Sequence, residues 1–520
     1  MYQPAPDAPW SRLTLALVPV VVLIVLVPLL AVTLPPLHDY PFHLTRADAI
    51  AALTGQVEHA TPYLLGSFAL PNVAMDVVTL GLTAFLPPLV AGRVFLGIVL
   101  VLLLGGTVAL HRVLHGRFSP WPLLAAFFLY NWIFLYGFTN YLFGVAVMLW
   151  AVAAWLATRR HGTALRLGVG SGLAVVLLFC HLVAFGLFAV VLGGLALTES
   201  VAQWRQSRRI ALASLLAPAI PIGLALILFV ALSPTAGEVR QPITYHGWIG
   251  WKPLMAYRTV LGSIPWLDAV TLAPIALLLA VAAWRRLVQA AWPMLIPVVL
   301  LGLTFLVMPN TLFGSMYADA RLPIAVLLVV IASLDLRRVA RRPMLVAAGV
   351  LLALLSLRSA VIAADWRAAA PVFDRFVAAF ATLPAGSTLY AATAEPYPSL
   401  AYRSPLELAR WHPPLKHIAS LATLGRDVFV PSTWADPFKQ PIAVPARLAA
   451  AKQLQSDNPF KTPDQASLAD AVARIRALHP VDGRAAIFLL LVQPALLDGP
   501  PPPGLEAVAT GPDFVLWRVN

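Results

Sequence analysis

Residues 34–50 (LPPLHDYPFHLTRADAI) place an acidic side chain where it could do chemistry, directly after the first long apolar run. Pro41 disfavours helical geometry in the residue before it and is itself tolerated in the first turn of a helix. We therefore expect a helix from about Pro41 to Gly55, with Asp39 just before it and its carboxylate facing a cavity. A carboxylate so placed can act as a general base. In the alternative interpretation, Asp39 only caps the helix.

Basic and base-capable side chains surround this acid. His43 and Arg46 are three residues apart, so they share one face of the expected helix and join Asp39 in a candidate catalytic group. In the alternative interpretation, His43 is an anchor at the lipid headgroups. His38 and His43 flank Asp39, which makes a divalent metal there conceivable. No His, Cys or Glu cluster has the spacing of a zinc site, so we expect no metal.

A second candidate lies in the segment PNTLFGSMYADAR (309–321), where Arg321 precedes another apolar run. A planar guanidinium suits phosphate oxygens, so Arg321 is a candidate clamp on a lipid phosphate, with Arg46 as a further candidate. In the alternative interpretation, Arg321 is an arginine whose charged end reaches the membrane surface.

The segment 233–269 contributes further cations to the same expected phosphate site. Its aromatic residues are typical of a membrane-interface belt, but cations in this segment are less readily explained. The candidate phosphate ligands are Arg240, Lys252 and Arg258, and His246 is a candidate sugar ligand.

Aromatic residues also gather in FFLYNWIFLYGFTNYLFG (127–144). Most of this stretch is expected to pack between helices. A turn there with Tyr136 and Asn140 could instead line a sugar site together with His38. We interpret His181, beside the lone Cys180, as a packing histidine.

The composition defines the setting of these residues. The chain has 520 residues, of which 60% are apolar and 11% charged, and its net charge is +13. Soluble domains average about 45–50% apolar and about 25% charged residues. The chain therefore needs a bilayer, and the single cysteine excludes an internal disulfide. No glycine-rich phosphate loop is present, which argues against a nucleotide-driven cytoplasmic engine within this chain.

Basic clusters predict the orientation of the chain, because cytoplasmic loops collect Lys and Arg. They also explain the positive charge without a nucleic-acid partner. With these clusters inside, the sequence predicts an all-α polytopic bundle of about eleven spans, its N-terminus inside and its C-terminus outside. The expected spans are 13–33, 93–110, 121–136, 141–157, 167–181, 183–199, 211–232, 270–284, 293–308, 322–335 and 344–362.

Two regions outside the membrane complete the predicted organisation. In the first outer loop (34–92), segment 73–90 carries Asp76 and two prolines, so we expect a surface helix rather than a span. Residues 363–520 are more polar, with short apolar runs at 387–393, 485–493 and 513–520. We therefore predict a membrane domain over 1–362, followed by a small extracytoplasmic α/β domain.

This layout resembles the GT-C superfamily of integral-membrane glycosyltransferases, such as protein O-mannosyltransferases, aminoarabinose transferases and bacterial enzymes acting on lipopolysaccharide. The resemblance rests on Asp39 in HDYPFH soon after the first span, on PNVAMDVVTLGLTAFLPP (71–88) leading to Arg93, and on a multi-span body with a tail domain. It covers the whole chain in architecture but few residues in motif. Many members carry an acidic pair in the first loop, whereas Asp48 and Glu58 are not adjacent here.

The resemblance implies an enzyme of the bacterial inner membrane that takes a sugar from a polyprenyl-phosphate donor. The acceptor would be a hydroxyl of a lipid, glycan or protein. Asp39 would match the catalytic base and Arg321 the cation that holds the carrier phosphate. The missing acidic pair puts a metal-dependent variant in doubt.

Two other functions remain open from the sequence. A transporter or lipid flippase usually carries ionisable residues midway along its spans and often shows repeated halves, neither of which we find. A scaffold that uses its tail domain for assembly would tolerate replacement of Asp39.

Overall fold

The computed structural model describes residues 10–207, 212–238, 243–245, 248–262, 264–312, 314–336, 339–394, 414–456, 458–478, 486–497 and 499–520. The chain divides into two compact units. Unit 1 comprises Met1–Leu30, Ala69–Ala74 and Leu96–Ala363, and unit 2 comprises Ala31–Phe68, Met75–Phe95 and Ala364–Asn520. Most of the segment that follows the first helix therefore groups with the C-terminal part of the chain.

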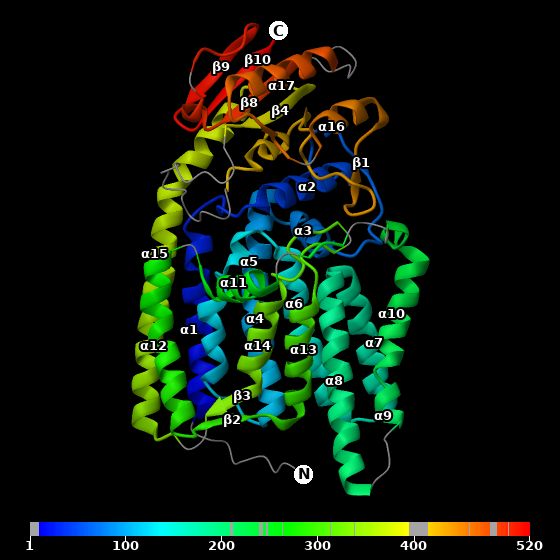
Figure 1. Cartoon of the computed structure of the whole chain (residues 1–520), viewed down its shortest axis with the longest axis vertical. Coiled ribbons are helices and arrows are strands. Elements are labelled where there is room, and N and C mark those ends of the chain that lie inside the picture. Colours follow the sequence, from blue (N-terminus) through cyan, green and yellow to red (C-terminus); the bar gives the residue numbers. More distant parts are fainter. Residues whose placement is uncertain are drawn as a thin grey trace. The chain divides into compact units, whose positions relative to one another are not determined.

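Unit 1 is built almost entirely of helices (Figure 1). Its long helices are α1 (Trp10–Leu30), α4 (Pro88–His115, which starts in unit 2), α6 (Thr139–Ala157), α7 (Thr163–Cys180), α8 (Leu182–Ser207), α12 (Pro265–Trp284) and α15 (Arg341–Phe380, which ends in unit 2). The shorter ones are α5 (Trp132–Leu135), α9 (Leu212–Leu216), α10 (Ala219–Leu232), α11 (Trp248–Val260), α13 (Leu295–Val307) and α14 (Leu322–Ser333). The 3₁₀ helices are η1 (Trp121–Phe128), η2 (Thr158–Arg160), η3 (Pro234–Glu238) and η4 (Trp292–Met294).

Among the described residues, seven helices are long and apolar enough to cross a membrane, and four shorter apolar helices accompany them. The chain is therefore a multi-pass membrane protein. Ten of the eleven segments expected to span coincide with helices in unit 1, although 211–232 is divided into α9 and α10. The exact number of spans and their orientation stay predictions.

The expectation of one continuous helix over residues 121–136 is wrong. The segment forms η1 and α5, separated by Asn131 in an extended conformation. The Asn131 side chain accepts hydrogen bonds from the amides of Ile133 and Phe134, so it starts a new helix instead of continuing the old one. Nearly all of this segment is buried, which makes it part of the packed interior of unit 1.

Ion pairs fix both the interior and one end of unit 1. Arg358 of α15 pairs with Asp268 of α12 at 2.7 Å, and Figure 1 shows these two helices side by side. Strands β2 (Val288–Ala290) and β3 (Leu334–Leu336) pair antiparallel. Asp335 on β3 accepts hydrogen bonds from the Arg117 guanidinium at 2.9 and 2.6 Å. Removal of either member of such a pair leaves the other charge buried and unpaired, which is costly.

Unit 2 contains a mixed sheet with the strand order β5-β4-β8-β10-β9 and with β7 beside β4. Strand β4 runs parallel to β5, β7 and β8, whereas β10 runs antiparallel to β8 and β9. The bounds are β4 (Ser387–Thr393), β5 (Val428–Phe429), β7 (Phe460–Lys461), β8 (Ala486–Val492), β9 (Leu505–Gly511) and β10 (Phe514–Val519). Three of these strands coincide with the short apolar runs in the sequence.

Helices and a two-stranded pairing complete unit 2. They are α2 (Tyr40–Leu53), α3 (Ala74–Thr83), α16 (Ala449–Gln455), α17 (Gln465–Leu478) and the 3₁₀ helices η5 (Ile418–Thr423), η6 (Ala446–Leu448) and η7 (Pro494–Leu496). Strand β1 (Leu64–Leu65) pairs antiparallel with β6 (Ile442–Ala443). One hydrophobic core includes Ile50 of α2, Tyr390 of β4 and Leu489 of β8, so the first loop and the tail fold together.

Candidate functional site

Asp39 lies immediately before α2 and is 2% exposed. The helix begins at Tyr40 with Pro41 in its first turn, as the sequence predicts. The Asp39 carboxylate makes no capping hydrogen bond to α2, so the interpretation of Asp39 as a helix cap is wrong. The side chain turns instead toward two imidazoles.

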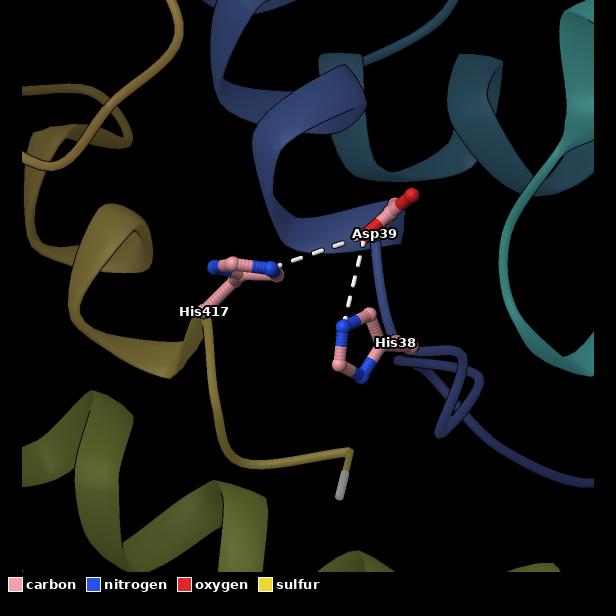
Figure 2. Close-up of side chains that lie close together, drawn as sticks. All are labelled: His38, Asp39 and His417. Carbon is pink, nitrogen blue, oxygen red and sulfur yellow. Dashed lines mark ion pairs between the residues drawn. The ribbon is translucent and has the colours of Figure 1, made fainter. Parts of the chain in front are cut away.

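These imidazoles belong to His38 and His417 (Figure 2). Oδ1 of Asp39 lies 3.6 Å from Nε2 of His38 and 3.5 Å from Nε2 of His417. The two rings meet edge to face with their centroids 4.8 Å apart. His417 precedes η5 in the tail, so both ends of the chain contribute to this cluster, which we call the Asp39 cluster.

Burial favours the neutral form of the His417 ring. Burial lowers the pKa of His417 well below its usual value, and the nearby His38, Lys416 and His43 oppose its protonation further. Nδ1 of His417 has no hydrogen-bond partner among the described residues. A neutral ring can either donate an N–H to the Asp39 carboxylate or offer a lone pair to a cation.

The Asp39 cluster has the donor set of a metal site. One ligand atom from each of His38, Asp39 and His417 lies within 4.8 Å of the others. Two imidazoles and a carboxylate, with a fourth position open, are typical of catalytic zinc sites. Of the two histidines that flank Asp39 in the sequence, only His38 belongs to this set. The expectation that no metal binds stays a prediction.

Aromatic rings border the same cluster. Phe42 lies 4.2 Å from the His417 ring and 4.6 Å from the Trp434 ring, measured between centroids. Sequence analysis missed both His417 and Trp434. Neither follows a motif, and both are hundreds of residues from Asp39 in the chain, so no local spacing could reveal them.

His43 and Arg46 belong to a separate buried network. Arg46 donates to both Asp76 oxygens, with Nε at 2.6 Å and Nη2 at 3.0 Å. Its Nη2 also lies 3.1 Å from Nδ1 of His43. A guanidinium only donates, so Nδ1 of His43 accepts in this contact. A phosphate could reach Arg46 only by competing with Asp76, and the catalytic role of His43 stays a prediction.

Arg321 in unit 1 lies against aromatic and imidazole rings. Its Nη1 is 3.4 Å from Nε2 of His181, and its guanidinium covers the Phe138 ring at 4.3 Å. Tyr141 donates a hydrogen bond to the Arg321 carbonyl at 2.8 Å. His181, which we expected only to pack, is thus the ring that meets this guanidinium.

Lys252 and Arg258 lie on α11 of the same unit. The Lys252 ammonium donates to Oδ2 of Asp319 at 2.8 Å and to the Met308 carbonyl at 2.5 Å. Arg258 is 7% exposed and lies over the Trp132 ring. Lys252 thereby contacts both ends of the loop between α13 and α14. We call Lys252, Asp319, Arg321 and His181 the loop cluster.

The candidate sugar ligands of unit 1 are also packed. Tyr136 stacks on Phe138 with a centroid separation of 4.7 Å. Asn140 donates to the Asn72 carbonyl at 2.8 Å. Arg240 and His246 lie outside the described residues.

The predicted site residues therefore fall into two groups. Asp39, His38, His43 and Arg46 belong to unit 2, whereas the other described candidates belong to unit 1. The structure brings Asp39 together with His38 and Arg46 together with His43. Convergence of the two groups in one pocket stays a prediction.

Two solved structures share the fold of this protein over nearly the whole chain. The crystal structure of ArnT from Cupriavidus metallidurans bound to undecaprenyl phosphate has a TM-score of 0.52 at 12% identity and covers 98% of both chains. ArnT in the apo state gives 0.51 at 13% identity, with the same coverage. Such low identity establishes a shared fold only.

A third structure, the arabinofuranosyltransferase AftD from Mycobacteria, has a TM-score of 0.44 at 14% identity and matches 40% of its own chain. No family model and no curated protein sequence matches the chain.

Proposed function

We propose that the protein transfers a sugar from a polyprenyl-phosphate donor to a hydroxyl of a lipid, glycan or protein. The observation that carries this proposal is the position of Asp39, which is buried and contacts one histidine from each end of the chain. The GT-C fold of a multi-pass membrane protein supports it. ArnT with the same fold binds undecaprenyl phosphate.

In the proposed reaction Asp39 is the general base. The acceptor oxygen attacks the anomeric carbon, the bond from that carbon to the phosphate oxygen breaks, and the acceptor proton passes to Asp39. The polyprenyl phosphate leaves, and the sugar is transferred with inversion. A sugar or serine hydroxyl is a poor nucleophile, so a carboxylate within hydrogen-bond reach accelerates the attack. His38 and His417 hold the Asp39 carboxylate in a site that excludes water.

Cations of the loop cluster stabilise the leaving phosphate in this proposal. Negative charge grows on the phosphate as the sugar departs, and a guanidinium in a site with little water stabilises that charge strongly. Arg321 is the first candidate, because its ring neighbours orient it. Lys252 of the same cluster and Arg258, which lies outside it on α11, are the next candidates. The proposal requires these cations and Asp39 to act on the same donor.

The orientation of the chain follows from its charges. Basic segments such as 158–166 and 204–209 lie between expected spans and favour the cytoplasmic side. The Asp39 cluster and the loop cluster then lie on the outer side of the bacterial inner membrane. Both substrates can be reached there, since the donor enters from the bilayer and needs no nucleotide.

Asp39→Asn tests the general base, because the amide keeps the size of the side chain and loses its basicity. We expect turnover of purified enzyme with a labelled polyprenyl-phosphate sugar to fall by roughly 10²–10⁴-fold, with donor binding retained. Asp470→Asn makes the same chemical change on an exposed face of α17 and should leave turnover unchanged. Wild-type turnover by a folded Asp39→Asn enzyme would contradict the assignment.

Metal analysis of the wild type, Asp39→Asn and His417→Ala distinguishes a general base at position 39 from a metal ligand. If Asp39 acts as a base alone, wild-type protein contains no stoichiometric divalent metal and chelators do not affect turnover. Stoichiometric metal that both Asp39→Asn and His417→Ala lose would instead make Asp39 a metal ligand. Lipid movement across proteoliposomes without any sugar transfer would favour the flippase and overturn the proposed function.

A further inference from the structure

Trp434 is the partly exposed member of the group of rings beside Asp39. Its ring lies 4.6 Å from Phe42 and 5.7 Å from His417, measured between centroids. It also meets the His43 ring edge to face at 6.2 Å. Phe42, His43 and His417 are 1%, 5% and 3% exposed, whereas Trp434 is half-buried. The indole is therefore the part of this group that a molecule from outside meets first.

The segment that carries Trp434 is fixed on both sides of the indole. On one side, the Thr433 carbonyl accepts a hydrogen bond from the Lys452 ammonium of α16 at 2.8 Å. On the other side, the Asp436 amide donates to the Gln440 side chain at 3.1 Å. Trp434 is thus held in place before any ligand arrives, which lowers the entropic cost of binding to it.

Two buried polar atoms close to Trp434 have no hydrogen-bond partner in the part of the chain that the structure describes. One is Oγ1 of Thr433, the preceding residue, and the other is Nδ1 of His417, whose ring contacts the indole. Buried polar groups normally have partners, so these two atoms are suited to the hydroxyls of a bound molecule. An aromatic surface with unpaired polar atoms on neighbouring residues matches a sugar ring, which has apolar C–H faces and a rim of hydroxyls.

The position of Trp434 assigns it to the acceptor and not to the donor phosphate. In the proposed reaction Asp39 takes the proton of the attacking hydroxyl, so the acceptor oxygen lies within hydrogen-bond reach of this carboxylate. The leaving phosphate lies on the opposite side of the anomeric carbon, because the attack inverts that centre. The His417 ring contacts both Asp39 and Trp434, so a sugar stacked on the indole lies close to the carboxylate that takes its proton.

We propose that Trp434 stacks on a sugar ring of the acceptor, which makes the acceptor a glycan or a glycolipid. The inference rests on the proposed function and narrows the acceptor that this function leaves open. A flat indole covers the C–H face of a sugar, and its N–H can donate to a hydroxyl at the rim. A serine side chain or a simple lipid alcohol has no such face. Trp434 therefore selects the acceptor, whereas Asp39 performs the chemistry.

A matched set of acceptors tests the selection, with the enzyme purified in a detergent that has no sugar headgroup. The set contains octyl glycosides of glucose, galactose, mannose and N-acetylglucosamine, octanol as the same chain without a sugar, and a serine-containing peptide. With a labelled polyprenyl-phosphate sugar as donor, we expect transfer to at least one octyl glycoside and none to octanol or the peptide. Transfer to octanol or the peptide as efficient as to the octyl glycosides would overturn the inference and leave the proposed function intact.

Trp434→Ala tests the residue itself. We expect the KM for the octyl glycoside to rise by about tenfold or more, the effect of removing an aromatic anchor. The KM for the donor and the kcat at saturating acceptor should change by less than about threefold, because Asp39 is untouched. Trp434→Phe keeps an aromatic face and should recover part of the loss. Phe438→Ala removes a ring that is 44% exposed on the same segment and should behave as the wild type.

Ligand-detected NMR makes the test independent of catalysis. Saturation of the wild-type protein should pass to the ring C–H protons of at least one of the corresponding methyl glycosides, and should be lost in Trp434→Ala and retained in Phe438→Ala. This pattern supports the sugar site even if the protein transfers no sugar, in which case only the proposed function fails. Equal saturation transfer from the wild type and Trp434→Ala, or none from the wild type, would overturn the inference.

Discussion

Asp39 and Arg46 are close in sequence but have opposite surroundings. Asp39 faces two imidazoles at 3.5 and 3.6 Å. Arg46 is fixed by a bidentate contact with the Asp76 carboxylate, and its side chain is 1% exposed. Charge on Arg46 is therefore already neutralised within the fold. The simplest role for Arg46 is to hold α2 against α3, so that Asp39 is presented in one orientation.

Asp76→Asn tests this structural role. The substitution leaves the Arg46 charge buried without its carboxylate, which typically costs about 3–5 kcal/mol. We expect the free energy of unfolding to fall by a correspondingly large amount. Denaturant titration of the protein purified in detergent measures this change. An Asp76→Asn protein as stable as wild type would show that the pair does not hold α2.

The double variant Arg46→Met with Asp76→Leu removes both charges and serves as the control. We expect it to recover most of the lost stability, because an apolar pair of similar volume needs no buried charge. Its donor binding decides the remaining question about Arg46. Normal binding confirms a structural role, whereas a weakened affinity for polyprenyl phosphate would restore Arg46 as a phosphate ligand.

Sequence alone pointed to two of the three residues of the Asp39 cluster. Asp39 and His38 stand next to each other, and the proline that follows indicates where the helix starts. His417 could not be predicted, because its contact with Asp39 depends on how the tail folds back on the first loop. A single sequence holds no local signal for such a contact.

At the level of elements, apolar runs predicted most helices because each run is long and has few polar interruptions. The prediction for 121–136 was wrong for a local reason, since an asparagine side chain replaced a backbone hydrogen bond within an otherwise apolar stretch. The strands of the tail were visible as short apolar runs. Their order was not, because parallel pairing of β4 with β8 is fixed by distant contacts.

Gly194→Ala tests the close contact between α8 and α13. The new methyl carbon would lie 2.8 Å from the Pro297 backbone, which is too close for van der Waals packing. We expect the free energy of unfolding to fall by about 1–3 kcal/mol, the usual cost of overpacking. Gly193→Ala on the same helix is the control and should be as stable as wild type or more so, because alanine favours helix and a Cβ there would meet nothing within 4 Å. Equal stability of the two variants would contradict this close contact between α8 and α13.

At the level of the whole molecule, the first loop and the tail share one hydrophobic core and one cluster of titratable groups. The boundary predicted at residue 363 divides the chain into two consecutive segments. The unit that contains Asp39, however, includes residues from both sides of that boundary. This arrangement could not be predicted from the sequence, because segments that fold together need not be adjacent in the chain. Two short strands, β1 and β6, join the same two parts of the chain.

Burial of His417 makes the stability of the protein depend on pH. The pKa of His417 is lower in the folded protein than in the unfolded chain, so the unfolded chain binds more protons below its usual pKa of 6.5. The stabilisation is therefore complete above pH 6.5 and is lost as the pH falls, by at most about 1.4 kcal/mol per pH unit.

We expect the melting temperature to fall between pH 6.5 and pH 5 in the wild type and to fall less in His417→Gln, as measured in detergent. His161→Gln, which removes an exposed histidine, should follow the wild type. Identical pH profiles for His417→Gln and the wild type would show that His417 does not contribute to this dependence.

The pairing of Asp39 with His417 also sets an order of events during synthesis. Asp39 leaves the ribosome early, whereas His417, which completes its surroundings, is made much later in translation. A nascent chain already threaded through the bilayer would therefore contain the carboxylate but not the finished site. A protein that transfers sugar as proposed would acquire this site only after His417 had been made, so chains terminated before His417 would be inserted in the membrane but inactive.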